Sequence, residues 1–386
     1  MREVCVVDAV RSPYGKRRGA FSGLHATDLL GQVLHGLLNR TGVNGDQIDQ
    51  VIGGCVSQAG MQTSNLTRWA WLTAGLAVEV PATTIDAQCG SSQQALTLGT
   101  GLIGSGLADA IVCCGVEMMS RVPMGSPVPA DGSLGTPVTD AYRKRYEYTS
   151  QFDSADRIAA HWGLGREDCD AFAQRSQDAA ARAVAAGRFT SQIIPITVTG
   201  NEGELTVVNR DQGPRPTTIA GLAGLDPVNG PGGIHTAGSS SQMTDGASAL
   251  LLMAREKADA LGLRPLATVH DTILIGSDPV LKLTGPIPAT TKVLKDNGLT
   301  MQDIDVIEIN EAFAAVVLAW QQEHGPDPAR VNPNGGAIAL GHPLGATGAG
   351  LVAKAVHELI HGDGELALVT ACCGGGMATA TLLYRS

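Results

Sequence analysis

The chain has 386 residues, of which 44% are hydrophobic and 17% are charged, so it has enough apolar material for two or three packed domains and is not disordered. Its 27 basic and 37 acidic residues give a net charge of −10, and only 4% of its residues are aromatic, which argues against a nucleic-acid-binding protein. The eight cysteines include no Cys-x-x-Cys spacing, so the sequence predicts neither a disulfide framework nor a structural zinc site.

No segment has the pattern of an export signal or a membrane span. The apolar start of the chain is interrupted by Asp8, and the apolar run at 314–320 is far shorter than the roughly 18 residues that a spanning helix needs. The last residues carry no peroxisomal or retention signal. We therefore expect a cytoplasmic protein that does not use a membrane as a partner.

Strand-like apolar runs recur along the chain and are separated by helical stretches. The clearest runs lie at 4–7, 51–56, 304–309 and 367–370. Alternation of strands and helices is typical of an α/β protein, and it predicts parallel sheets covered by helices.

The chain also contains an internal repeat. Residues 42–49 match residues 298–305, which lie 256 positions later, and the same shift brings 109–115 onto 365–371. The second pair consists of short apolar runs after an acidic residue, the pattern of a buried strand. The repeat predicts two similar α/β halves.

The segment between the halves has a different character. Residues 122–138 are rich in Pro, Gly and Ser and indicate a loop, whereas 153–188 has Ala-rich helical periodicity and precedes a strand-and-turn region. An insertion of this length often covers an active site. We predict an N-terminal half at 1–119 and 245–266, a loop domain at 120–244 and a C-terminal half at 267–386.

The first segment that could carry chemistry surrounds Cys89. A β-prone run ends near Asp86, Gly90 permits a sharp turn, and Ser91 or Ser92 could cap a helix that begins near Gln93. At the start of a helix, the helix dipole favours a thiolate, which is the nucleophilic form of cysteine. The alternative is a buried, inert thiol, and the turn alone leaves both interpretations open.

A glycine-rich stretch at 332–350 contains His342, between Gly341 and Pro343. The repeat maps His342 onto position 86, three residues before Cys89, so both segments should lie at equivalent ends of the two halves. An isolated histidine is more often a core or surface group, but this placement favours a site. The stretch lacks the Gly-Lys-Ser/Thr of a phosphate-binding loop, which excludes that alternative.

Two further segments follow strands of the second half. Cys372 precedes three glycines that would let backbone amides approach a ligand, although a plain glycine turn explains the pattern equally well. Asn310 and Glu311 end an apolar strand, where site residues are common, but they could also cap the next helix.

Three other patterns carry less weight. The G-x-G-x-x-G at 99–104 lies within a predicted helix, so we do not expect a dinucleotide site there. The basic clusters at 16–18 and 143–145 are typical of solvated surface, although either could meet a phosphate-bearing substrate.

Together these segments resemble the thiolase family over essentially the whole chain. The similarity rests on the opening Asp-Ala-Val-Arg-Ser-Pro-Tyr-Gly-Lys and on four later blocks, which are Cys89-Gly-Ser-Ser, Asn310-Glu-Ala-Phe, Gly341-His-Pro-Leu-Gly-Ala-Thr-Gly and Cys372-Cys-Gly-Gly-Gly-Met. The resemblance implies two α/β/α layered halves, duplicated, with an inserted loop domain.

The resemblance also implies a role for each matched residue. Cys89 would be the nucleophile that carries the acyl group, His342 would take its proton, and Cys372 would be the second acid/base. Asn310 would hold a water that forms one oxyanion site with His342, and the amides of Cys89 and Gly374 would form the other. Ser241 would contact the pantetheine of coenzyme A.

The implied reaction is CoA-dependent cleavage of a 3-ketoacyl-CoA into acetyl-CoA and a shortened acyl-CoA, within fatty-acid or sterol β-oxidation. Acyl-CoA and coenzyme A would be the partners, no cofactor would be permanently bound, and the enzyme would be a homodimer or homotetramer. Ser92 stands where the family usually has glycine, and Ser239-Ser240 replaces the common Asn-Ala. These departures point towards bulky, sterol-derived acyl groups.

Three alternatives remain. A biosynthetic acetoacetyl-CoA thiolase would share all of these motifs. A decarboxylating ketoacyl synthase normally has two active-site histidines where Asn310 and Cys372 stand here. A non-catalytic lipid carrier of the same fold is expected to lack one of Cys89, His342 and Cys372, and all three are present.

Overall fold

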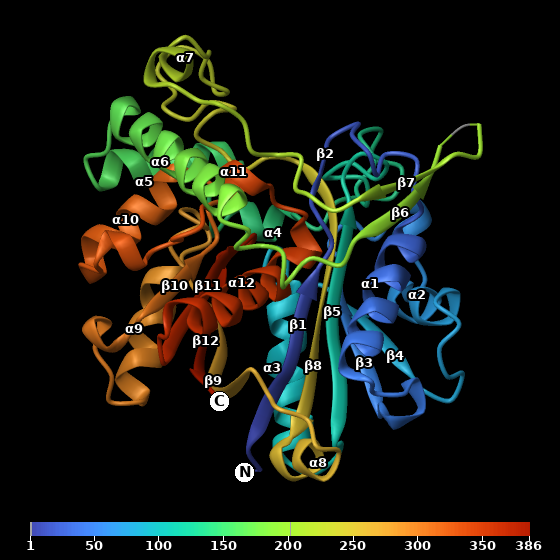
Figure 1. The fold of residues 1–386 in the computed structure, drawn as a ribbon. Coiled ribbons are helices and arrows are strands. Elements are labelled where there is room, and N and C mark those ends of the chain that lie inside the picture. The colour runs from blue at the N-terminus through green and yellow to red at the C-terminus, as the bar shows by residue number, and fades with distance from the viewer. Residues whose placement is uncertain (1, 201) are drawn as a thin grey trace.

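The structure, a computed structural model, describes residues 2–200 and 202–386. Its main sheet has the strand order β10-β11-β12-β9-β1-β8-β5-β3-β4, with β2 paired to β8 (Figure 1). The N-terminal side of this sheet contains β1 (Val4–Arg11), β2 (Gly15–Lys16), β3 (Gln50–Gly54), β4 (Ala82–Ile85), β5 (Ala110–Met118) and β8 (Thr244–Ala254). The C-terminal side contains β9 (Ala267–Gly276), β10 (Val306–Ile309), β11 (Leu366–Cys373) and β12 (Met377–Arg385).

The two sides repeat one pairing pattern, which confirms the duplicated α/β fold. Strand β3 is parallel to β5, and β8 is antiparallel to both β5 and β1. In the same way, β10 is parallel to β11, and β12 is antiparallel to both β11 and β9. Within the sheet, the two sides are joined where Cys5 and Val6 of β1 pair with Thr268 and Ala267 of β9.

The prediction of parallel sheets was therefore wrong, because the sheet is mixed. A turn of three glycines connects β11 directly to β12, and so short a connection can join only antiparallel strands. Strand β8 follows the long insertion, and its antiparallel direction could not be inferred from neighbouring helices.

The helices form three layers, one between the two sides of the sheet and one on each outer face. Helices α3 (Ser91–Gly104) and α12 (Thr347–Gly362) pack against each other between the two sides of the sheet, and their first residues are 256 positions apart, as the repeat requires. Helices α1 (Ala26–Thr41) and α2 (Leu66–Thr73) cover the outer N-terminal face. Helices α9 (Pro286–Asp296) and α10 (Ala314–His324) cover the outer C-terminal face, and α8 (Arg255–Ala260) follows β8 (Figure 1).

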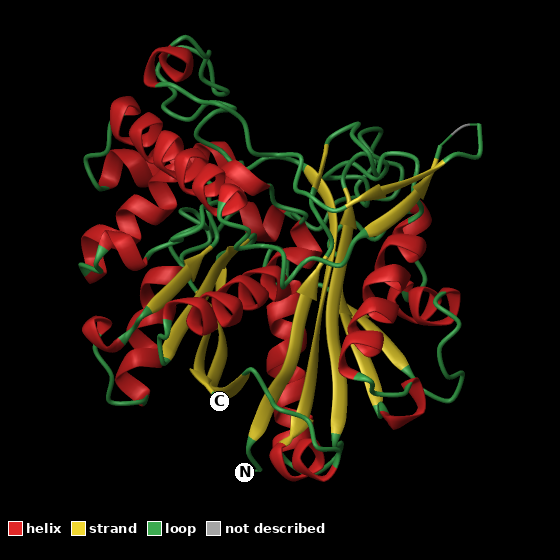
Figure 2. Cartoon of the chain, viewed as in Figure 1, coloured by secondary structure: helices red, strands yellow, loops and turns green. Residues whose placement is uncertain are grey.

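The inserted segment lies above the carboxyl ends of several central strands, where helix and loop alternate (Figure 2). It contains α4 (Asp140–Arg143), α5 (Gln151–His161), α6 (Arg166–Ala185), the hairpin β6 (Ile196–Thr199) and β7 (Leu205–Val208), and α7 (Ile219–Ala223). Helix α5 packs on α10, and α6 packs on α10 and the short helix α11 (Ala337–Leu340). The predicted loop at 122–138 contains neither helix nor strand. The residue limits of the three domains stay a prediction.

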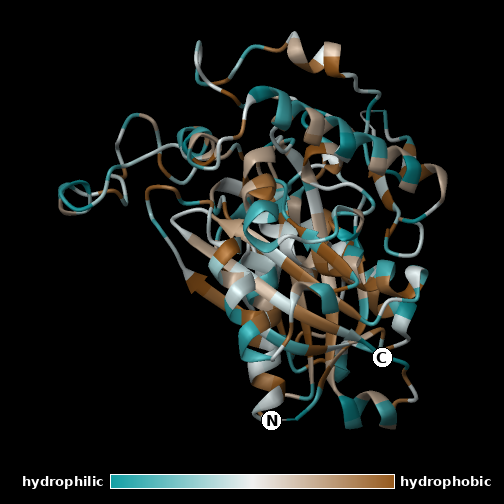
Figure 3. Cartoon of the chain, turned by 90° about the vertical axis from the view of Figure 1, so that its left-hand side faces the viewer, coloured by the Kyte–Doolittle hydropathy of each residue, from teal (hydrophilic) through white to brown (hydrophobic). Residues whose placement is uncertain are grey.

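The hydrophobic core lies where the strands meet the helices, and Figure 3 shows the hydrophobic residues concentrated on the central strands. Within residues 2–200 and 202–386, no helix is long and apolar enough to cross a membrane. The same residues contain no cluster of three or more His, Cys, Asp or Glu side chains that could hold a metal ion.

Candidate active site

Cys89 lies in a tight turn between β4 and α3. Gln88, directly before it, has a left-handed backbone with φ of 54°, and Ala87 and Cys89 form an isolated bridge across the turn. Helix α3 begins at Ser91 with Gly90 as its N-cap, and no side chain caps it. The expected serine cap was therefore wrong: the Ser91 hydroxyl accepts from the Ala87 N–H at 2.9 Å and donates to the Gln88 carbonyl at 2.6 Å, so it stabilises the turn instead.

Burial, rather than the helix dipole, controls the protonation of Cys89. Its side chain is almost fully buried, and burial raises the pKa of the thiol to about 12. Hydrogen bonds to the sulfur from the backbone N–H groups of Gly374 and of Cys89 itself act in the opposite direction but are weaker. The helix start favours a thiolate, but the low-dielectric surroundings disfavour a charge on the resting sulfur more strongly. Cys89 consequently needs a base.

His342 is the residue that the resemblance assigns as this base. It is buried and follows Gly341, whose backbone φ of 115° suits glycine and whose added Cβ would collide with Thr244. Burial lowers the pKa of the imidazole to about 4, so the ring is neutral at pH 7. A neutral ring has one nitrogen free to accept a proton.

Thr347, which the sequence analysis did not single out, determines whether Nδ1 or Nε2 of His342 can accept a proton. Its hydroxyl donates to the Pro343 carbonyl at 3.0 Å, and its oxygen lies 2.6 Å from Nδ1 of His342. When the hydroxyl hydrogen points at the Pro343 carbonyl, Nδ1 carries the ring hydrogen and donates it to Thr347. The other nitrogen, Nε2, is therefore unprotonated and can accept. In the sequence, the only sign of this contact was a hydroxyl residue five positions after the histidine.

Asn310 lies beside that nitrogen. It directly follows β10, its backbone N–H donates to the Thr370 carbonyl at 3.0 Å, and its Nδ2 is 3.4 Å from Nε2 of His342. Its Oδ1 is buried and has no hydrogen-bond partner among the described residues. This free acceptor is compatible with the expected bound water, which stays a prediction.

The turn after β11 brings the remaining candidates to Cys89. Gly374 lies against Gln88, so that an added Cβ would be 2.8 Å from its Oε1. Cys372 is fully buried at the end of β11, and burial raises the pKa of its thiol well above the usual value, with a smaller contribution from a charge on Cys89. Both cysteines are thus protonated at rest and close enough to influence each other electrostatically.

A cavity of about 730 Å³ opens onto this group. His342 and Ser241 line it, and so do Met119 and Leu344, which pack directly on Cys89. The other lining residues are mostly apolar or basic: Lys16, Arg17, Met124, Ser150, Gln151, Phe152, Arg215, Val228, Ala237, Ser240, Gln242, Met243, Ala312 and Phe313. The first basic cluster of the sequence therefore reaches the cavity, whereas residues 143–145 are absent from its described lining.

Glu117 is a second residue that the sequence analysis missed. Its fully buried carboxylate accepts hydrogen bonds from the backbone N–H groups of Val56 and Ser57 at 3.0 Å and of Gly345 at 2.9 Å. The Nε2 of Gln62 donates a fourth at 2.9 Å. Glu117 therefore connects the loop that carries His342 to the end of β5. In the sequence, an acidic residue inside the otherwise apolar run at 110–118 was the sign of such a role.

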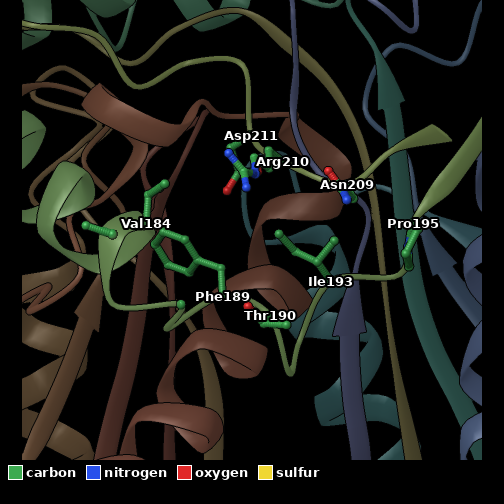
Figure 4. Close-up of a pocket in the computed structure, with 10 residues that line it drawn as sticks. Val184, Phe189, Thr190, Ile193, Pro195, Asn209, Arg210 and Asp211 are labelled. Carbon is green, nitrogen blue, oxygen red and sulfur yellow. The ribbon is translucent and has the colours of Figure 1, made fainter. Parts of the chain in front are cut away.

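A second cavity, of about 570 Å³, lies in the inserted segment next to Phe189, Ile193 and Asp211 (Figure 4). None of its ten described lining residues is a cysteine or a histidine. Its described lining therefore offers neither a thiol nor an imidazole, and the cavity beside His342 is the candidate active site.

Comparison with known proteins agrees with this geometry. The family model described as "Thiolase, N-terminal domain" matches residues 4–256, and "Thiolase, C-terminal domain" matches residues 263–385. The steroid 3-ketoacyl-CoA thiolase FadA6 of Mycobacterium tuberculosis is 45% identical over 100% of this chain and 95% of its own. A beta-ketoadipyl-CoA thiolase of Acinetobacter baylyi is 40% identical over 100% of both chains. The crystal structure of the Bacillus anthracis acetyl-CoA acetyltransferase superposes with a TM-score of 0.93 at 34% identity, covering 100% of this chain and 99% of that one. The chain belongs to the thiolase family.

Proposed function

We propose that the protein is a degradative thiolase that cleaves 3-ketoacyl-CoA thioesters with a bulky acyl group, using coenzyme A as the second substrate. The observation that carries the proposal is that Cys89 and a second thiol, Cys372, lie close to each other beside a mostly apolar cavity that is also lined by a neutral His342. These are the groups that a reaction through two thioesters requires.

In the first half of the reaction, His342 takes the proton of Cys89 and the sulfur attacks the 3-keto carbon. The bond between C2 and C3 breaks, and Cys372 gives its proton to C2, which releases acetyl-CoA and leaves the acyl group on Cys89. In the second half, Cys372 takes the thiol proton of free coenzyme A, whose sulfur attacks the acyl-enzyme. Cys89 leaves and recovers its proton from His342, so the enzyme is regenerated.

Two groups of hydrogen-bond donors would stabilise the oxyanions of these steps. The N–H groups of Cys89 and Gly374 are directed at the Cys89 sulfur, where the tetrahedral intermediate would form. Once His342 has accepted the proton, Nε2–H becomes a donor beside Asn310 and the water proposed there. One donor of this kind is typically worth about 3–4 kcal/mol of transition-state stabilisation.

The cavity supports a CoA ester with a large acyl group. Ser241 lies on its wall and would contact pantetheine, and the apolar lining suits a bulky chain. Lys16, Arg17 and Arg215 line the same cavity and form no ion pair within the described residues, so they are available for the phosphates of coenzyme A. The names of the relatives favour steroid-derived or dicarboxylic acyl groups over acetoacetyl-CoA.

A panel of 3-ketoacyl-CoAs tests the proposal. We expect kcat/KM for CoA-dependent cleavage to be higher for substrates with ring-bearing or dicarboxylic acyl groups than for acetoacetyl-CoA. A maximum at acetoacetyl-CoA would favour the biosynthetic alternative, and no cleavage of any substrate would refute the function. Exchange of both Lys16 and Arg17 for glutamine should raise the KM of every CoA ester, whereas the control Lys144→Gln should not.

A further inference from the structure

His235 joins three elements of the structure at one buried side chain. Its Nδ1 is 2.8 Å from Oδ1 of Asp156 on α5, and its Nε2 accepts from the backbone N–H of Ala315, in the first turn of α10, at 3.4 Å. The Cys169 sulfur on α6 lies 3.9 Å from the same nitrogen. The imidazole is only 1% exposed, and it lies outside the described lining of the catalytic cavity.

The hydrogen-bond partners define the state of this ring. The carboxylate of Asp156 can only accept, so Nδ1 carries the hydrogen and Nε2 has the free lone pair. Burial raises the pKa of Cys169 to about 12, so Cys169 is a thiol that can donate to Nε2. Burial also lowers the pKa of His235, although Asp156 opposes this shift, and the ring is neutral at pH 7. All of its hydrogen-bonding groups are then satisfied.

The contacts of His235 stabilise the start of α10. Phe313 is the N-cap residue of this helix and has no side-chain hydrogen bond to it, so the first amides of the helix need other partners. His235 accepts from Ala315, and the Ser239 carbonyl accepts from Ala314 at 3.0 Å. Asp156 also accepts from the backbone N–H of His235 at 3.2 Å, which holds the loop that carries the imidazole.

The start of α10 is also a wall of the catalytic cavity. Residues 239–241 run beside 312–314, where the Ser241 N–H donates to the Ala312 carbonyl at 3.0 Å and Ser240 bridges to Phe313. The Phe313 ring lies edge-on between His235, at a centroid distance of 5.4 Å, and Phe152, at 4.8 Å. Ser240, Ser241, Ala312 and Phe313 all line the cavity.

We propose that His235 is a positioning residue for the CoA substrate: its two ring nitrogens clamp the inserted segment to α10, and this fixes the wall formed by 239–241 and 312–314. The inference rests on the proposed function, because it identifies that wall as the surface that binds the pantetheine arm. Loss of the clamp should weaken binding of CoA esters while leaving the chemistry at Cys89 intact.

The test compares His235→Phe with His324→Phe at the opposite end of α10. His324 contacts the Ile287 carbonyl at 3.1 Å, so its loss controls for removal of a histidine that packs at the other end of α10. We expect His235→Phe to raise the KM for 3-ketoacyl-CoA and the Kd of free coenzyme A by about 10-fold or more, because buried polar groups lose their partners. The rate at which iodoacetamide alkylates Cys89, which needs no pantetheine contact, should change less than about twofold.

Two conservative variants separate positioning from folding. Glutamine at 235 can reach the Nε2 position and accept from Ala315, whereas asparagine reaches only the Nδ1 position. The proposal predicts near-normal coenzyme A binding in His235→Gln and weakened binding in His235→Asn. Equal affinity in these two variants, or an equal loss in His324→Phe, would overturn it. Coenzyme A binding is measured by calorimetry and does not depend on turnover, so failure of the proposed thiolase reaction would be recognised separately.

Discussion

The tautomer of His342 depends on one hydroxyl group, and Thr347→Val tests this dependence. Valine has almost the same shape as threonine but cannot accept from Nδ1–H, which lies 2.6 Å from the Thr347 oxygen. The ring must then leave a buried N–H unpaired or move the hydrogen to Nε2, which blocks the proton transfer from Cys89. An unpaired buried donor costs about 1–3 kcal/mol, which corresponds to a loss of roughly 5- to 150-fold in kcat/KM.

The matched control is Thr347→Ser, which keeps the hydroxyl and should retain most of the activity. The assay has two parts: the initial rate of CoA-dependent 3-ketoacyl-CoA cleavage, and the rate at which an acyl-CoA adds its acyl group to the enzyme, followed by intact-protein mass spectrometry. We expect Thr347→Val to slow both, because His342 acts in the acylation step. A valine variant with normal acylation, or a serine variant that is equally slow, would refute the assignment of the tautomer.

Four further predictions concern the same site. Cys89→Ala should abolish both acylation and turnover, whereas Cys372→Ala should lose about 10²–10⁴-fold in turnover and still accept an acyl group, as mass spectrometry can determine. Because burial lowers the pKa of His342 to about 4, kcat should show no acid limb near pH 6.5 and should fall only as the pH approaches 4, where the imidazole becomes protonated. Glu117→Gln places an amide NH₂ against buried donors and should lower the free energy of unfolding by about 2–3 kcal/mol, with Glu117→Asp less affected in denaturant titrations. Light scattering should give the mass of a homodimer or homotetramer, and a monomer would contradict that prediction.

Much of the fold could be predicted because the repeat is visible in the sequence. The shift of 256 positions relates β3 to β10, β5 to β11 and the start of α3 to the start of α12. What failed was strand direction, since an apolar run has the same pattern in a parallel and in an antiparallel pair. The structural repeat is interrupted at β4, because the equivalent residues belong to the short helix α11.

The candidate site could be located from the sequence where glycine turns mark its residues. The protonation of those residues could not be predicted, because it depends on burial. Glycines near Cys89, His342 and Cys372 marked tight turns, which follow β4, α11 and β11 in the structure. The pKa of the Cys89 thiol depends on how much water the fold excludes, which no local sequence pattern reveals. The role of Thr347 depends on the direction of one hydroxyl group, which no spacing encodes.

The duplication also explains why only one of the two equivalent turns can carry a cysteine. The position equivalent to Cys89 is Gly345, where an added Cβ would lie 2.7 Å from the Gly54 carbonyl oxygen and 2.8 Å from the Cys55 Cα. A cysteine therefore cannot occupy the second turn. The backbone N–H of Gly345 instead donates a hydrogen bond to the buried carboxylate of Glu117 at 2.9 Å, and this bond holds the loop of His342 against the first half. One copy of the turn carries Cys89, the proposed nucleophile, and the other, which has no side chain at Gly345, holds the loop of His342, the proposed base.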